Sequence, residues 1–145
     1  MRIRKIDHVG VVVRDLAATK EFFLDFGLET LGSVELEGAW LDKIVGLENV
    51  RSEIVMLGTP DGQATIELSK FHSPTGETGV EQSPANALGI RHIAFQVEGI
   101  EDIVAKLNQK GIKTFGEIQN YKNIYKLCYF RGPEGIILEI AERIK

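Results

Sequence analysis

The chain has 145 residues, 43% of them hydrophobic and 26% charged, which is typical of one globular domain rather than of a disordered or fibrous chain. Its formal net charge is -4 and it has no basic run, which argues against nucleic acid and membrane surfaces as partners. The single cysteine, Cys128, and the absence of a signal peptide or of an apolar run of about 18 residues predict a cytoplasmic protein.

The first predicted element is a strand over residues 6–13 with His8 in its third position. Residues 90–97 repeat this pattern with His92 in third position, 84 residues further along the chain. The same offset pairs apolar and glycine positions without a gap: Leu16 with Ile100, Phe23 with Leu107, Gly27 with Gly111, and Leu28 with Ile112. The chain is therefore predicted to contain two copies of one unit.

In the first unit, about residues 1–70, a helix is expected from the N-cap Asp15 to Gly27. Strands follow at about 30–36, 51–58 and 63–69, and a Pro-Asp-Gly turn joins the last two. Relative to the second copy, this unit has about 12 extra residues, which we place in Gly38 to Val50 over one open end of the sheet. Trp40 in this insertion is a candidate to cover a binding pocket, although simple packing is an equal alternative.

Residues 71–88 are rich in Ser, Pro, Thr and Gly and are predicted to be a linker, with His72 at its start. The second unit, about 89–145, has an apolar helix face from Ile100 to Leu107 and a stop at Gly111. Strands are expected at about 112–118, 124–131 and 136–142, with a Pro-Glu-Gly turn before the last. Each unit therefore has the order β-α-β-β-β.

A glutamate interrupts the apolar pattern of the last strand in each unit. Glu67 lies between Ile66 and Leu68, and Glu139 lies between Leu138 and Ile140. Because side chains alternate across a strand, each glutamate points away from its aliphatic neighbours. The simplest arrangement packs the aliphatic faces under the helices and gathers the histidines and glutamates on the opposite face.

Two imidazoles and two carboxylates in one pocket suit a divalent ion such as Ni, Zn, Co, Mn or Fe. Four protein ligands leave two positions of an octahedral metal for water or for a bidentate substrate. Without a cation or protons, two converging carboxylates repel each other. The predicted ligands are His8, Glu67, His92 and Glu139.

The paired β-α-β-β-β units, these four residues, and the segment from Phe130 to Gly135 before Glu139 resemble the vicinal oxygen chelate superfamily. This superfamily includes glyoxalase I, methylmalonyl-CoA epimerase, extradiol dioxygenases, fosfomycin resistance enzymes and bleomycin-binding proteins. The resemblance implies an α+β fold over residues 1–145, in which two modules form a curved mixed sheet, or half-barrel, around a metal site with the helices outside. It also implies a homodimer.

The His-Glu-His-Glu set is most similar to glyoxalase I. We therefore expect a lyase or isomerase that acts on a small substrate with vicinal oxygens through a metal-bound enediolate, with Glu67 or Glu139 as the catalytic base. The alternatives are an extradiol-type Fe(II) dioxygenase and a metal-free drug-binding resistance protein of the same fold.

Three further residues are candidates of lower rank. His72 is expected to be a solvated loop histidine and Cys128 a packing residue without activation. Cys128 and Tyr129 are neighbours on a predicted strand, so one of them faces the cavity, and the alternation does not decide which.

Overall fold

The computed structural model describes residues 1–76, 78–79 and 82–144 and divides into two compact units, Met1–Gly79 and Val80–Lys145. The boundary lies within 71–88, the stretch predicted to be a linker, of which positions 77, 80 and 81 are outside the described residues. Each unit contains one four-stranded mixed sheet and follows the predicted β-α-β-β-β order, with one additional short helix in the first unit.

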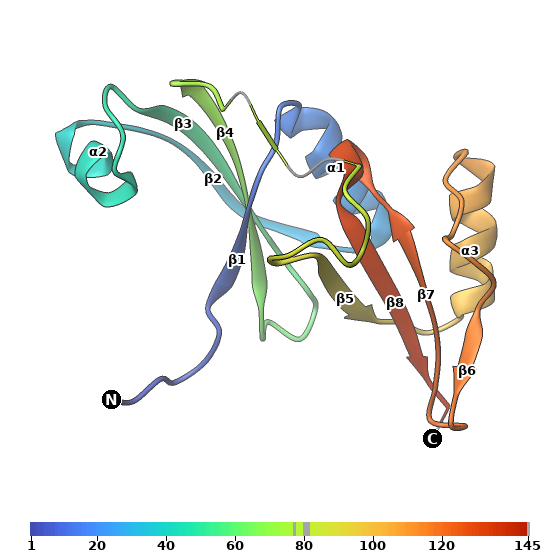
Figure 1. The fold of residues 1–145 in the computed structure, drawn as a ribbon. Coiled ribbons are helices and arrows are strands. Elements are labelled where there is room, and N and C mark those ends of the chain that lie inside the picture. The colour runs from blue at the N-terminus through green and yellow to red at the C-terminus, as the bar shows by residue number, and fades with distance from the viewer. Residues whose placement is uncertain (77, 80–81, 145) are drawn as a thin grey trace. The chain divides into compact units, whose positions relative to one another are not determined.

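Unit 1 contains four strands and two helices (Figure 1). They are β1 (His8–Val12), α1 (Leu16–Phe26), β2 (Glu29–Glu37), α2 (Ala39–Val45), β3 (Arg51–Gly58) and β4 (Thr65–Ser73). The strand order is β1-β4-β3-β2, with β1 parallel to β4 and the other pairs antiparallel. The Pro-Asp-Gly turn joins β3 to β4 as predicted. The parallel pairing brings β1 and β4 side by side although they are distant in sequence.

Unit 2 repeats this topology. Its elements are β5 (His92–Gln96), α3 (Ile100–Gln109), β6 (Gln119–Tyr121), β7 (Tyr125–Arg131), a single 3-10 turn (Pro133–Gly135) and β8 (Ile137–Arg143). The strand order is β5-β8-β7-β6, again with the first pair parallel and the rest antiparallel.

Local capping sets the helix ends. The Asp15 carboxylate accepts a hydrogen bond from the backbone N–H of Ala18, and Gly27 ends α1 in the left-handed conformation with φ 118°. Both boundaries of α1 agree with the prediction. Helix α3 ends at Gln109, two residues before the predicted stop at Gly111, which also has positive φ.

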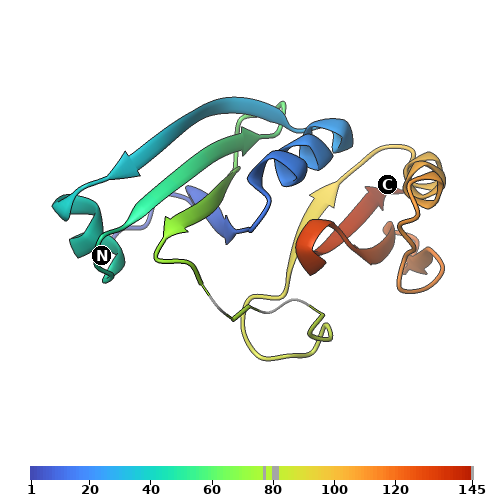
Figure 2. The ribbon, with the colours of Figure 1, turned by 90° about the horizontal axis from the view of Figure 1, so that it is seen from above.

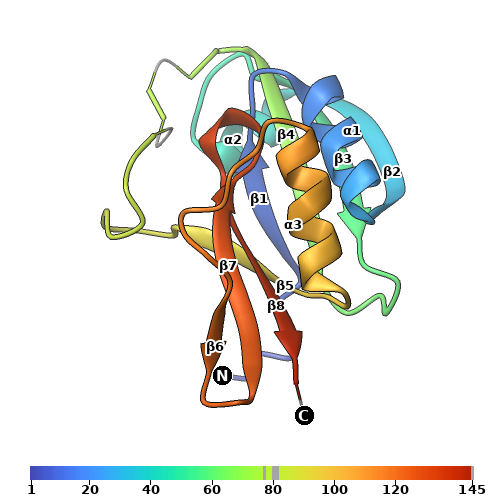
Figure 3. The same ribbon diagram turned by 90° about the vertical axis from the view of Figure 1, so that its right-hand side faces the viewer.

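Each unit buries the aliphatic face of its sheet under its helix. Helix α1 packs on β2, β3 and β4, and α3 packs on β8 (Figures 2 and 3). Fully buried side chains occupy these layers; they are Phe23, Leu57 and Leu68 in unit 1, and Ile100, Phe130 and Ile140 in unit 2. The buried core therefore fixes which face of each sheet is left for polar side chains.

Two predicted boundaries are wrong. Residues 112–118 do not form a strand, because Thr114 alone among them forms a β-bridge, with Phe130. The Thr114 hydroxyl then donates a hydrogen bond to the Gly116 carbonyl, and the chain turns before β6 begins at Gln119. Strand β4 runs through Ser73, so His72 is a strand residue rather than a loop residue. Its Nε2 lies 3.1 Å from Oε1 of Glu53 on the neighbouring β3.

The insertion of unit 1 forms the seven-residue helix α2 and connects β2 to β3. It lies where Arg51 pairs with Ser73, six residues along β4 from Glu67, or about 20 Å at the usual strand rise. Helix α2 therefore lies toward the C-terminal end of β4 (Figure 1). Its residue Trp40, 53% exposed, is at the opposite end of β4 from Glu67 and does not cover it. No helix in the described parts of the chain is long and apolar enough to cross a membrane.

Candidate metal half-sites

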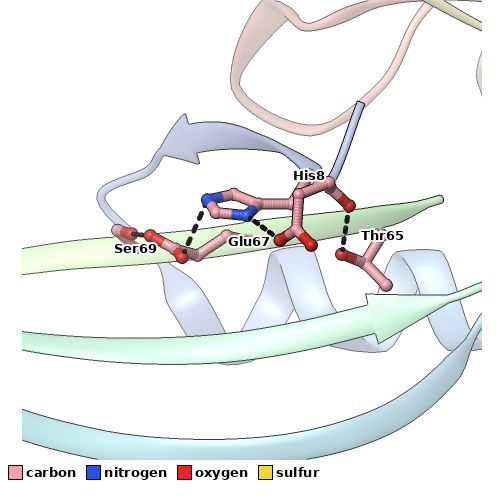
Figure 4. Close-up of polar contacts among 5 residues, drawn as sticks. His8, Thr65, Glu67 and Ser69 are labelled. Carbon is pink, nitrogen blue, oxygen red and sulfur yellow. Dashed lines mark hydrogen bonds and ion pairs between the residues drawn. The ribbon is translucent and has the colours of Figure 1, made fainter. Parts of the chain in front are cut away.

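In unit 1, the side chains of His8 and Glu67, two of the four predicted metal ligands, face each other. The parallel pairing of β1 with β4 aligns Gly10 with Glu67, so His8 lies two residues away on the same face. His8 Nε2 is 3.3 Å from Glu67 Oε2, and the Ser69 hydroxyl donates to Glu67 Oε1 at 3.4 Å (Figure 4). The His8 and Glu67 side chains are 38% and 27% exposed, so the pair is open to ligands.

A second carboxylate holds the other side of the His8 ring. His8 Nδ1 donates to Asp7 Oδ2 at 2.8 Å, and the Thr65 hydroxyl donates to the Asp7 carbonyl at 3.2 Å. The hydrogen bond to Asp7, aided by the charge of Glu67, raises the pKa of His8 above 6.5. A carboxylate on Nδ1 leaves Nε2 as the coordinating atom, which is the usual arrangement behind metal-bound histidines.

Unit 2 places His92 and Glu139 in the same way. Strand β5 is parallel to β8 and Ala94 is aligned with Glu139, as Gly10 is aligned with Glu67 in unit 1. His92 Nε2 lies 3.2 Å from Glu139 Oε2, and these side chains are 37% and 16% exposed. Both expected pairings within a unit are therefore present.

Unit 2 adds an aromatic side chain that the sequence left undecided. Tyr129 faces the histidine, with its hydroxyl 3.4 Å from His92 Nε2 and the ring centroids 4.8 Å apart. Cys128 points the other way and is buried, and burial, together with the charge of Glu139, raises its thiol pKa, as fits a packing residue. Tyr129, rather than Cys128, lies on the face of Glu139 because β7 pairs Tyr129 with Glu139. The alternation of side chains along one strand does not give this register.

The spacing within each pair fits two ligands of one metal ion. Donor atoms about 2.1 Å from a metal and at right angles to each other lie about 3 Å apart, close to the two His–Glu separations. With Nδ1 of a neutral His8 donating to Asp7, Nε2 and the Glu67 carboxylate are both acceptors, so a proton or a cation must lie between them. Among the described residues, no group of three His, Cys, Asp or Glu side chains is close enough to hold a metal ion.

The family follows from the sequence as a whole. A sequence model of the Glyoxalase/Bleomycin resistance protein/Dioxygenase superfamily matches residues 5–140. The chain belongs to this superfamily. This confirms the resemblance drawn from the repeat and the four polar residues, and the paired four-stranded sheets match the fold of the superfamily.

Several known proteins are similar to this chain over nearly their full length. A glyoxalase family protein from Bacillus cereus is 38% identical with a TM-score of 0.95, and the match covers 100% of this chain and 97% of that one. The uncharacterized proteins YwbC of Bacillus subtilis and YaeR of Escherichia coli are 31% and 25% identical, each over 97% of this chain and 98% of their own length. TnmS3, an antibiotic binding protein from Streptomyces, shares the fold at 14% identity and a TM-score of 0.64, covering 99% of this chain and 98% of its own.

Proposed function

We propose that this glyoxalase-superfamily protein is a metal-dependent lyase or isomerase that acts on a small substrate with vicinal oxygens. His8, Glu67, His92 and Glu139 are the proposed ligands of one divalent ion, drawn from Ni, Zn, Co, Mn and Fe. The observation that carries the proposal is the repeated His–Glu separation of 3.3 and 3.2 Å at equivalent positions of the two units.

The number of ligands argues for one shared ion. A single pair supplies two protein ligands, which is fewer than the three that catalytic zinc sites usually have. Two pairs together supply four and leave two octahedral positions, which is what a bidentate substrate needs. A homodimer, as predicted from the resemblance, gives the same number of ligands per ion if the two pairs come from different subunits.

The chemistry follows from the carboxylates. The bound metal would polarise the substrate carbonyl and so acidify the neighbouring C–H. Glu67 or Glu139 accepts that proton, and the electron pair of the broken C–H bond shifts toward the carbonyl oxygen. Return of the proton to the former carbonyl carbon, together with transfer of the neighbouring hydroxyl proton to the former carbonyl oxygen, completes an isomerisation.

A metal titration of the full chain tests the proposal. Purified protein, stripped with a chelator, is titrated in a calorimeter with Ni, Co, Zn, Mn and, without oxygen, Fe(II). We expect one ion per chain for at least one metal, and losses of affinity of at least tenfold in both His8→Ala and Glu139→Gln. His72→Ala is the matched control, since His72 also pairs with a glutamate but lies outside the proposed site.

The outcomes separate the alternatives. Failure to bind any of these metals would overturn the enzymatic proposal and favour a metal-free binding protein. Unchanged affinity in both ligand variants would show that the ligand set is wrong. Substrate-dependent oxygen consumption by the Fe(II)-loaded protein would indicate a dioxygenase instead of a lyase or isomerase.

A further inference from the structure

Two arginines of unit 2 converge on one backbone carbonyl. The Ser83 carbonyl oxygen accepts from Nη2 of Arg91 at 2.9 Å and from Nη2 of Arg131 at 2.6 Å. Arg91 directly precedes β5, and Arg131 is the last residue of β7. Their other hydrogen bonds are also to carbonyls, those of Pro84 and Gly135. Within the described residues, neither guanidinium forms an ion pair with a carboxylate.

Two positive charges therefore lie close together, with no carboxylate paired to either one in the part of the chain that the structure describes. A carbonyl supplies lone pairs but no net charge, so the repulsion between two guanidinium groups that share it persists. Each guanidinium has five N–H donors, and the carbonyl bonds above leave donors free on both. A carboxylate or a phosphate group satisfies both needs, because it supplies negative charge and accepts paired bonds from the planar arginine fork.

A continuous row of side chains links these arginines to the half-site of unit 2. The Arg131 guanidinium stacks over the Phe115 ring at 5.4 Å, and the Phe115 and Tyr129 ring centroids are 6.3 Å apart. Tyr129 in turn contacts His92. Arg131 and Tyr129 are alternate residues of β7 and therefore share the face that carries Glu139, which pairs with Tyr129.

We propose that Arg91 and Arg131 form an oxyanion-binding site that holds a carboxylate or phosphate group of the ligand. Resting on the proposed function, this names the substrate class as a small anionic molecule whose vicinal oxygens bind the metal while a second, charged group binds the arginines. Phe115 and Tyr129 supply the surface along which the ligand lies between the two.

Anion binding by the metal-free full chain tests the arginine site directly. Inorganic phosphate and acetate are titrated calorimetrically at low ionic strength, and the anion that binds more tightly identifies the group. We expect Arg131→Gln and Arg91→Gln each to weaken binding at least tenfold and Arg131→Lys to weaken it less, since lysine keeps the charge but loses the fork. Arg51→Gln on β3 removes the same charge away from the cluster and is expected to bind as the wild type does.

The results decide between this site and a purely structural role in which the arginines only fasten residues 82–91 to β7. Absence of binding by both anions, or an equal loss in Arg51→Gln, would overturn the proposal. Thermal melts establish that each variant is folded, and Arg131→Lys keeps the test decisive if a glutamine variant unfolds. The anion titration uses metal-free protein, so its result does not depend on whether the protein binds a metal. A failure of this proposal can therefore be told apart from a failure of the proposed function.

A pair of probes tests the link to the metal. Dihydroxyacetone has vicinal oxygens and no charge, and dihydroxyacetone phosphate adds a phosphate to the same skeleton. With the metal-loaded protein, we expect dihydroxyacetone phosphate to bind at least tenfold more tightly than dihydroxyacetone, and this preference to disappear in Arg131→Gln. Equal binding of both probes by the wild type would overturn the assignment of an anionic substrate.

Discussion

Tyr129 on β7 and Met56 on β3 occupy the same place in the two units: Tyr129 lies directly opposite Glu139, and Met56 lies directly opposite Glu67. The repeated backbone thus places the same His–Glu pair beside an aromatic ring in one unit and beside a flexible thioether in the other. The duplicated fold accounts for the shared His–Glu pairs, and the side chain opposite each glutamate is a point at which the two units differ.

The ring of Tyr129, rather than its hydroxyl, is expected to stabilise unit 2. Tyr129→Phe keeps the contacts with His92 and Phe115, so we expect a loss of less than about 0.5 kcal/mol in unfolding free energy. Tyr129→Met introduces the side chain found in unit 1 and is expected to cost about 0.5–1.5 kcal/mol, the usual value of an aromatic pair. Urea unfolding measures both, and equal losses would show that the hydroxyl matters instead.

The buried residues that follow the two glutamates are expected to contribute similar amounts to the free energy of unfolding. Leu68 and Ile140 are both fully buried, one residue after Glu67 and Glu139 respectively. Truncation to alanine leaves a cavity, so each variant is expected to lose about 2–5 kcal/mol of unfolding free energy in urea. Val12→Ala, at a side chain 64% exposed, is the control and is expected to change it by less than about 0.5 kcal/mol. A small loss at Leu68 or Ile140 would contradict the assigned core.

Much of the fold could be predicted because the local signals agree with the tertiary packing. The Asp15 cap, the Gly27 stop and both Pro-acid-Gly turns depend on residues near one another in sequence, and the repeat is a match between two sets of such local patterns. The alternation around Glu67 likewise assigned the faces of the strands correctly, since burial of one face fixes which side chains point outward.

The rest depends on contacts between distant segments. Residues 112–118 have the pattern of a strand, yet among them only Thr114 forms a β-bridge, with Phe130. The end of β4 is set by pairing with β3 and by the His72–Glu53 contact, neither of which is readable from composition. For the same reason, the sequence leaves open whether Cys128 or Tyr129 faces the cavity, and it does not identify Arg131 as a neighbour of the site. Which residues share a face across strands follows from the register, and the sequence does not give the register.

Glu142 is expected to make the stability of unit 2 depend on pH. Its carboxylate on β8 accepts from the backbone N–H groups of Gly99 and Ile100 at 2.9 and 3.2 Å, which caps α3 from another element. These bonds, followed by the nearby Lys126, hold the pKa of Glu142 below its ordinary 4.5. A lowered pKa in the folded state means that the stabilisation is complete above the ordinary value and is lost as the pH falls through the folded value.

Glu142→Gln tests this dependence. We expect the variant to melt a few degrees below the wild type at pH 7, and the difference to shrink as the pH is lowered through the range in which glutamate protonates. Glu101→Gln is the matched control, because Glu101 also pairs with Lys126, at 2.7 Å, but caps neither amide. A pH-independent difference, or an equal effect in the control, would contradict the capping role.

Asp7 is expected to control metal affinity without binding the metal. Its hydrogen bond to Nδ1 fixes the His8 ring with Nε2 toward Glu67, and loss of such a partner usually lowers metal affinity about 10- to 100-fold. We therefore expect Asp7→Asn to weaken binding in a metal titration by this factor while its far-UV circular dichroism stays unchanged. Asp102→Asn in α3 removes the same charge far along the chain and is expected to bind as the wild type does. If both variants bound metal like the wild type, the Asp7–His8 contact would be only a surface hydrogen bond, and His8 would be oriented by Glu67 alone.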